Sequence, residues 1–156
     1  MAEISFKSVG ELSTDRKFQP TPNETPIGIK TPLQLGQKND GIFAMHFDIG
    51  KQIDDNLRNL ILTNWGDRVG FYDFGANLNE LTMELTSEAF DLEAMTRIKR
   101  AVGKWMSFVE LQTFNKTIIG RVQGSNVTQI KMQIIYAVPR LGITNKSLEL
   151  TFFIAG

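Results

Sequence analysis

The 156-residue sequence contains no cysteine and only one histidine, His46. Without cysteine, the chain forms neither disulfides nor thiolate metal sites, and it offers no cysteine nucleophile. A single histidine excludes a metal site built from several histidines, and we expect His46 to be an ordinary half-buried polar residue. We therefore predict no catalytic residue, no cofactor site and no metal site.

The chain also lacks net charge, because its 17 basic and 17 acidic residues cancel. Such a balance does not create the long-range field of a nucleic-acid-binding protein or of a polybasic membrane anchor. No stretch reaches the roughly 18 apolar residues of a membrane span, and the N-terminus lacks the basic and apolar regions of a secretion signal. We expect a soluble protein made in the cytoplasm, with partners that include neither nucleic acid nor a membrane.

Proline is scarce after residue 40, because all but one of the five prolines stand in residues 1–40. Proline removes a backbone donor and restricts the residue before it to extended conformations, so these residues are predicted to be an extended N-terminal arm. The arm is either a floppy terminus or a segment that becomes ordered along a neighbouring subunit. The second interpretation rests on spaced apolar anchors, which are Phe6, Phe18, Ile27, Ile29 and Leu33.

Residues 41–156 are predicted to form one domain. It begins with a short strand over residues 41–48, whose alternate residues share an apolar face. That face consists of Phe43, Met45 and Phe47. A helix over 49–63 follows, with Asp48 as its N-cap. Its apolar stripe has the 3.6-residue period of a helix and consists of Ile49, Ile53, Leu57, Leu60 and Ile61.

A second helix is predicted to end near Met106, after a loop in which three leucines face inward. The leucines are Leu78, Leu81 and Leu85. Three residues compete to begin the helix, namely Thr86, Ser87 and Asp91. Its apolar face consists of Phe90, Met95, Ile98, Val102 and Trp105. Its exposed side carries Arg97, Lys99, Arg100 and Lys104. This basic face is too short for a nucleic-acid patch, and it lacks interleaved aromatic residues and an overall positive charge.

From residue 107 the pattern changes to alternation with a period of two, which is typical of strands. A first strand begins at Ser107 and breaks parity near Thr113, which indicates a bulge or bend. The clearest strand covers 127–138, with Ile130, Met132, Ile134, Tyr136 and Val138 on one face. A last strand covers 148–154. The predicted fold class is α+β, with two amphipathic helices packed on a small, mainly antiparallel sheet that the 41–48 strand is a candidate to join.

The segment from Asp54 to Leu78 links the two helical regions and holds the most distinctive motifs. Gly66 stands just past the first helix, where the left-handed conformation favours glycine. Asp67 and Arg68 follow at once, so a charged pair is fixed close to the end of a rigid element. An Asp73-Phe74-Gly75 corner comes next; it resembles a kinase metal-binding loop, but the other kinase motifs and the length of a kinase domain are missing.

The order of these motifs resembles the baseplate wedge, or sheath initiator, family of contractile-tailed phages, which includes a type VI secretion baseplate subunit. The matching residues are Asn56-Leu57, Leu60 to Thr63, Gly66-Asp67-Arg68 and Asp73-Phe74-Gly75-Ala76-Asn77-Leu78. Asp67 stands where the family most often has glutamate. The family's Trp-Glu-Pro-Arg segment is Trp105-Met106-Ser107-Phe108 here, so only the tryptophan matches, and the family's ionic contact there is not carried over.

The resemblance implies a structural virion protein that links the baseplate wedge to the first sheath ring and initiates sheath assembly by inter-subunit strand addition. It implies a location in the tail baseplate, assembly in the host cytoplasm, and several copies in a symmetric particle. The implied partners are the tail sheath protein and other wedge and hub subunits. The interface candidates are Asp67, Arg68, Asp73, Phe74, Gly75, Trp105 and Phe108. Either the last strand or the strand from Ser107 is the edge for strand addition.

Two other functions stay open from the sequence. A lysozyme-like glycoside hydrolase of the tail needs two carboxylates across a cleft, one of them with a raised pKa. The residues Glu80, Glu84 and Glu88 recur every four positions, which on a helix makes one solvated stripe and not two opposed walls. We therefore expect no enzyme. The second alternative is a non-viral adaptor that binds another protein through the same sheet edge.

Overall fold

The computed structural model describes residues 25–36, 42–84, 88–121 and 127–155. The chain divides into two compact units, residues 1–49 and residues 50–156. No helix among the described residues has the length and apolarity required to cross a membrane.

The first unit contains a two-stranded antiparallel ribbon. Strand β1 (Gly28–Ile29) pairs with strand β2 (Met45–His46), with Ile29 opposite Met45. The ribbon continues through a bridge between Leu35 and Phe43. The predicted strand at 41–48 therefore exists in part, but it pairs with β1 and does not join the meander. Pairing between segments so close in sequence closes only a short loop, which lowers its entropic cost.

Part of the predicted arm is thus paired with the segment that follows it. The arm anchors Phe6 and Phe18 lie outside the described residues. Because residues opposite each other share a face, one face of the ribbon gathers apolar side chains. These include Ile29, Leu35, Phe43 and Met45, of which the first three are exposed. His46, on the other face, is buried and not half-buried as expected.

Helix α1 (Ile49–Leu62) matches the predicted helix to within one residue. Four of its five predicted stripe residues are buried, namely Ile53, Leu57, Leu60 and Ile61. The fifth, Ile49, is exposed at the first position of the helix. Helix α3 (Glu88–Trp105) also agrees, with Ile98 and Val102 buried and Trp105 packed at the margin of the core.

A short helix, α2 (Leu78–Glu84), replaces part of the predicted loop. Leu78 and Leu81 are buried as expected, but from a helix. The Asn77 side-chain amide donates to the Glu80 carboxylate at 2.7 Å, three residues later. An Asn followed three residues on by Glu is a helix-start signature, so the sequence did carry a local sign of this helix.

The sheet of the second unit has the order β3-β4-β5 and is antiparallel throughout. Its strands are β3 (Glu110–Arg121), β4 (Val127–Val138) and β5 (Ile143–Ala155), with a 3₁₀ turn η1 (Pro139–Leu141) between the last two. The predicted break near Thr113 is a register shift between Leu111 and Thr113. All five predicted inward residues of β4 are buried.

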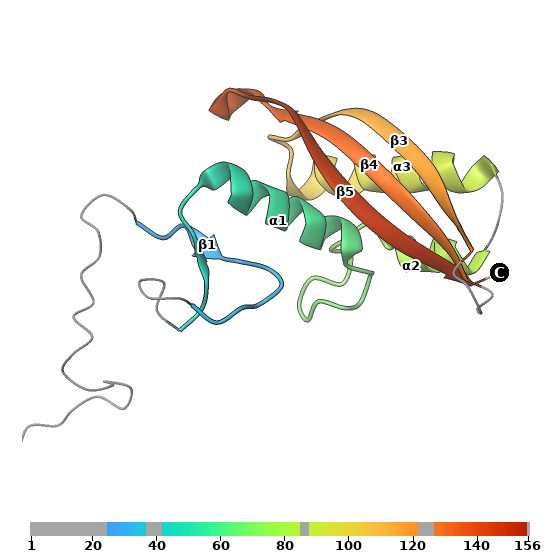
Figure 1. Ribbon diagram of the computed structural model, residues 1–156, viewed down its shortest axis with the longest axis horizontal. Helices are drawn as coiled ribbons and strands as arrows, with labels where there is room; N and C mark the ends of the chain where they lie inside the picture. The colour runs from blue at the N-terminus through green and yellow to red at the C-terminus, as the bar shows by residue number, and fades with distance from the viewer. Residues whose placement is uncertain (1–24, 37–41, 85–87, 122–126, 156) are drawn as a thin grey trace, which may run out of the picture. The chain divides into compact units, whose positions relative to one another are not determined.

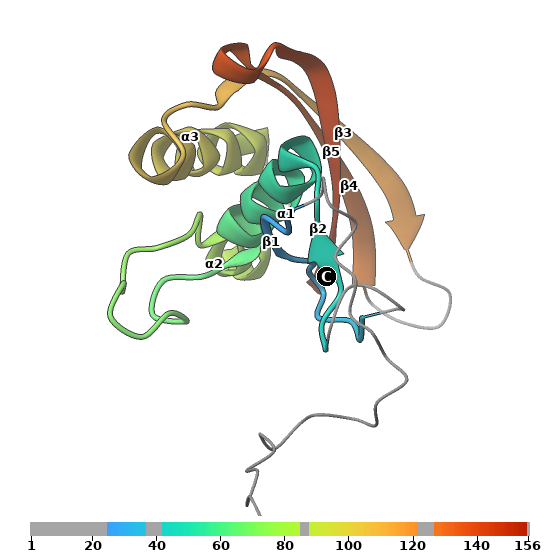
Figure 2. The same cartoon turned by 90° about the vertical axis from the view of Figure 1, so that its left-hand side faces the viewer.

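The helices of this unit lie on one side of the sheet, as Figure 2 shows for α1, α2 and α3. Figure 1 shows α1 lying on that side, in roughly the same direction as the strands. The buried faces of the helices and of β4 and β5 form one hydrophobic core. The fold class is α+β, as predicted, with a third helix that the sequence analysis had placed in a loop.

Candidate functional site

The loop between α1 and α2 begins with a turn that Asp67 closes. The Asp67 carboxylate accepts hydrogen bonds from the Asn64 backbone N–H at 2.9 Å and from the Asn64 side-chain amide at 3.2 Å. The Asp67 backbone N–H donates in return to the Asn64 carbonyl at 3.2 Å. An aspartate that bonds nearby backbone groups in this way fixes the turn. Asp67 therefore orders the chain just past α1.

Two glycines set the path of the loop. Gly66 has a φ of 88°, as predicted for the residue past the helix, and its N–H donates to the Tyr72 carbonyl at 2.8 Å. Gly75 has a φ of 110° and passes so close to α1 that a β-carbon there would lie 2.1 Å from the Thr63 carbonyl oxygen. The chain then bonds to α1, with Ala76 N–H donating to the Leu60 carbonyl at 3.2 Å. The corner thus satisfies a carbonyl that the end of a helix leaves unpaired.

The side chains of Arg68, Phe74 and Trp105 pack against one another in that order. The Arg68 guanidinium carbon lies 4.3 Å from the centre of the Phe74 ring, and the Phe74 ring lies edge-on to Trp105 at a centroid distance of 5.2 Å. Phe71 meets the same tryptophan at 5.7 Å. A cation over an aromatic face and edge-to-face rings are both favourable arrangements. This stack ties the Asp73-Phe74-Gly75 corner to the C-terminal end of α3.

Asp73 forms an ion pair with Lys104 on α3. The hydrogen bond from Lys104 holds the pKa of Asp73 below its ordinary value. Both side chains are more than half exposed, so the pair adds little to stability. Its effect is to orient the corner relative to α3.

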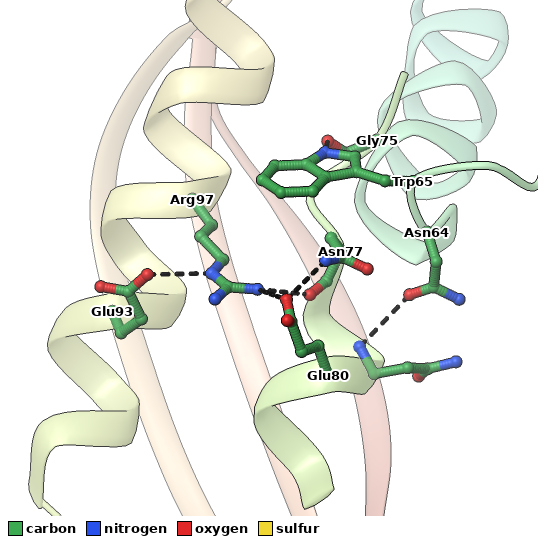
Figure 3. Close-up of polar contacts among 8 residues, drawn as sticks. Asn64, Trp65, Gly75, Asn77, Glu80, Glu93 and Arg97 are labelled. Carbon is green, nitrogen blue, oxygen red and sulfur yellow. Dashed lines mark hydrogen bonds and ion pairs between the residues drawn. The ribbon is translucent and has the colours of Figure 1, made fainter. Parts of the chain in front are cut away.

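Arg97 joins α3 to α2 and to the loop, as Figure 3 shows. Its guanidinium donates to Glu93 at 2.9 Å, to Glu80 at 2.7 Å and to the Asn77 carbonyl at 3.0 Å. Desolvation lowers the pKa of Arg97, but the hydrogen bonds to Glu93 and Glu80 outweigh it and raise the pKa above its ordinary value. Arg97 therefore acts as a structural clamp, although the sequence analysis had placed it on the exposed side of the helix.

Trp65 and Asn64 complete the clamp on the loop side. The Trp65 indole N–H donates to the Gly75 carbonyl at 3.2 Å, and the Asn64 side-chain carbonyl accepts from the Asn79 backbone N–H at 3.3 Å in the first turn of α2 (Figure 3). These partners are ten and fifteen residues apart. The roles of Trp65, Asn64 and Arg97 were not predicted from the sequence. Glu93, four residues before Arg97, was a usable signal, since such pairs face each other on a helix.

A groove of about 690 Å³ lies between the second half of α1 and the chain around Phe108. Five of the seven interface candidates line it, which are Asp67, Arg68, Phe74, Trp105 and Phe108. The other two, Asp73 and Gly75, line an adjacent cavity of about 170 Å³ that shares Trp105. Residues from three separate stretches of sequence are thus brought to one surface. Phe108 is 40% exposed there.

The loop beside the groove presents further apolar side chains to solvent. Val69 is 98% exposed, and Phe71 and Tyr72 are more than half exposed. Exposed apolar residues gathered beside a groove are typical of a protein-binding surface. Among the described residues, no group of histidine, cysteine, aspartate and glutamate is placed to hold a metal ion.

The edges of the sheet are the second candidate site. The outer sides of β3 and β5 pair with no other strand among the residues that the structure describes. An unpaired edge offers a row of backbone N–H and C=O groups to another chain. Both strands that the sequence analysis had left open as the edge are therefore outer strands, with β4 between them.

Comparison with known proteins identifies related folds. No family model matches this sequence, and no curated protein matches it. A "putative tail lysozyme" from Geobacter sulfurreducens has a similar structure, with a TM-score of 0.53, 18% sequence identity, and coverage of 69% of this chain and 91% of that chain. So does a chain of the anti-feeding prophage baseplate, with a TM-score of 0.52, 11% identity, and coverage of 85% of this chain and 86% of that one. The chain therefore has a fold that is also found in a tail protein and in a baseplate.

Proposed function

We propose that the chain is a structural subunit of a contractile-tail baseplate, present in several copies, that connects the wedge to the first ring of the tail sheath. The observation that carries the proposal is the sheet, whose outer strands are unpaired among the described residues in a fold also found in a baseplate. The motif residues gathered around one groove support it. The expected location is the tail baseplate of a virion assembled in the host cytoplasm.

The proposed mechanism is strand addition. An open sheet edge gains a full set of backbone hydrogen bonds when an extended segment of the next subunit lies along it. The core behind the sheet is already packed, with Ile134 and Tyr136 of the central strand fully buried, so the edge is held in place before the partner arrives. A preformed edge binds with less loss of conformational entropy than a flexible one. The first sheath subunits would thereby be placed in register.

Contacts to the wedge and hub are assigned to the other exposed surfaces. The groove that contains Arg68 and Phe108 offers a guanidinium, aromatic rings and amides to a neighbouring subunit. The ribbon of the first unit adds an apolar face with Ile29 and Leu35 exposed. A two-stranded ribbon is at best marginally stable alone, so a neighbour that covers this face would stabilise it. This extends the ordered-arm interpretation of the N-terminal region.

An enzymatic role is not part of the proposal. A glycosidase acid needs a carboxyl with a raised pKa, but the pKa of Asp73 beside the groove is lowered by Lys104. Glu80 and Glu93 both accept hydrogen bonds from Arg97. All three carboxylates are therefore engaged in ion pairs with basic side chains of α3. The glycoside hydrolase alternative would require acidic residues elsewhere in the chain.

Tail particles assembled without this chain provide the test. We expect baseplates with sheathless tubes, because the sheath has no starting ring, and we expect full sheaths when the chain is supplied again. Mass measurement of complete particles should find the chain in a small fixed copy number. Normal sheaths in its absence, or no copies in the particle, would contradict the proposal and favour the non-viral adaptor.

A further inference from the structure

The two outer strands of the sheet differ in how well they can accept another strand. We propose that β5, over residues 147–155, is the accepting edge, and that β3 is a blocked edge. The proposed occupant is an extended segment of the sheath protein with apolar residues at alternate positions. This inference rests on the proposed function, because it specifies where strand addition takes place.

Strand β3 is interrupted by two bulges. In its pairing with β4, the register shifts once between Leu111 and Thr113 and again between Ile118 and Gly120. Gln112 and Ile119 are left without opposite residues, so each shift adds one residue to β3 and none to β4. A bulge breaks the even spacing of backbone groups on the outer side and increases the local twist. The outer edge of β3 is therefore divided into short pieces.

A charged residue also protects β3 against pairing with a further strand. Lys116 stands opposite Met132, and Met132 is buried in the core, so Lys116 lies on the core face of the sheet. It is half-buried there, in the outermost strand. An inward-pointing charge on an edge strand is one of the devices by which proteins prevent further strand pairing, since a new strand would bury it. The two bulges and the inward-pointing Lys116 together prevent a further strand from pairing with the outer edge of β3.

Strand β5 has neither feature over most of its length. From Val127↔Ala155 to Tyr136↔Lys146 its register with β4 is unbroken, and its only shift lies beyond Tyr136, near Ile143. Its core-face residues Leu148, Leu150 and Phe152 are all buried. Lys146, which lies on the core face, stands at the end of this regular stretch of β5 and forms an ion pair with Asp54. Residues 147–155 are therefore a regular edge with an apolar inner face.

The geometry of β5 dictates the pattern of the occupant. The occupant's residues on the core side of the sheet would extend the apolar row of Leu148, Leu150 and Phe152, so these residues of the occupant must be apolar. On the outer side, Phe153 is 60% exposed and is the only large apolar side chain exposed on the described faces of the three strands. Residues directly opposite each other in adjacent strands contact closely, so an aromatic or β-branched residue opposite Phe153 would bind best. The other positions on the outer side of the occupant are free to be polar.

Amide hydrogen exchange of the full chain, alone and with purified sheath protein, tests the assignment. An added strand protects the outward N–H groups, which alternate along an edge strand. We expect alternate amides of 147–155 to exchange more slowly in the complex, with the amides of 110–121 unchanged. Protection of 110–121 alone would overturn the choice of β5 and leave strand addition intact. Protection of neither strand in a complex that does form would contradict strand addition itself.

A pair of variants provides a second measurement. Phe153→Ala is expected to weaken binding of the sheath protein about fivefold, the scale of one lost cross-strand pair. Thr117→Ala is the control, because Thr117, like Phe153, is exposed on the outer face of the sheet but stands in β3. It should bind as the parent does. Equal weakening by both variants, or weakening by Thr117→Ala alone, would overturn the inference.

Discussion

Gly75 passes so close to Thr63 that a β-carbon on the glycine would lie 2.1 Å from the threonine carbonyl oxygen and 2.7 Å from its carbon. Both contacts are to backbone, which cannot rotate away. The Asn77 N–H donates to the same Thr63 carbonyl at 3.3 Å. The corner of the loop is therefore held against the end of α1 by a glycine, and the groove and its motif residues depend on that approach.

Replacing this glycine should be costly. We expect Gly75→Ala to lower the free energy of unfolding by about 3–5 kcal/mol, from the clash and from a positive φ that alanine rarely adopts. Gly70→Ala is the control, because Gly70 also has a positive φ but a β-carbon there meets no atom within 4 Å. It should cost about 1–2 kcal/mol. Urea denaturation measures both, and equal losses would contradict the close approach.

The Arg97 clamp predicts a second stability effect. We expect Arg97→Met to destabilise the chain by about 1–3 kcal/mol, because Glu80, Glu93 and the Asn77 carbonyl lose a charged donor. Lysine is not an adequate substitute for a guanidinium that makes several bonds at once. The control is Arg100→Met, an exposed residue on the same helix. Thermal unfolding of the two variants should differ clearly; an Arg97 variant as stable as the control would show that the clamp adds nothing.

The buried Tyr136 should make the stability of the fold depend on pH in the alkaline range. Burial, followed by its hydrogen bond to Asp54, raises the pKa of Tyr136 above the ordinary value of 10.0. A raised pKa in the folded state means that the unfolded chain loses this proton first, so stability falls as the pH rises above about 10. Absorbance titration at 295 nm should show one of the two tyrosines resisting ionisation until unfolding. The resistant fraction should disappear in Tyr136→Phe; its persistence there would assign it to Tyr72.

The groove predicts a separation of binding from stability. We expect Phe108→Asp to lower incorporation of the chain into baseplates with little change in unfolding, because Phe108 is exposed at the groove. Leu92→Asp is the control, since Leu92 is more exposed, on α3, and does not line the groove. Counting copies per particle by mass compares the two. Equal incorporation would mean that the groove is not an interface.

The sequence predicted the elements whose pattern is local. The alternation from Ile130 to Val138 marked β4 correctly, and the change of parity near Thr113 marked the first bulge. The stripe from Ile53 to Ile61 marked α1. These signals depend only on which residues share a face, so no knowledge of the fold was needed.

Features that depend on distant partners were missed or misplaced. Helix α2 has only seven residues, and Asn64, fifteen residues before Asn79, bonds its first turn. Arg97 was assigned to solvent because its partners Glu80 and Asn77 lie far from it in sequence. The pairing of β2 with β1 was missed because each strand has only two residues. Only the fold shows that five of the seven motif residues line one groove, and their role at an interface stays a prediction.

An electron cryo-microscopy map of the assembled tail tests the central claim most directly. The account predicts a strand from a neighbouring subunit about 4.8 Å from the outer side of β5, which continues the sheet across the interface. The groove around Phe108 should be covered by a different subunit. A map in which this chain occupies the baseplate with the outer sides of β3 and β5 both bare would contradict the account.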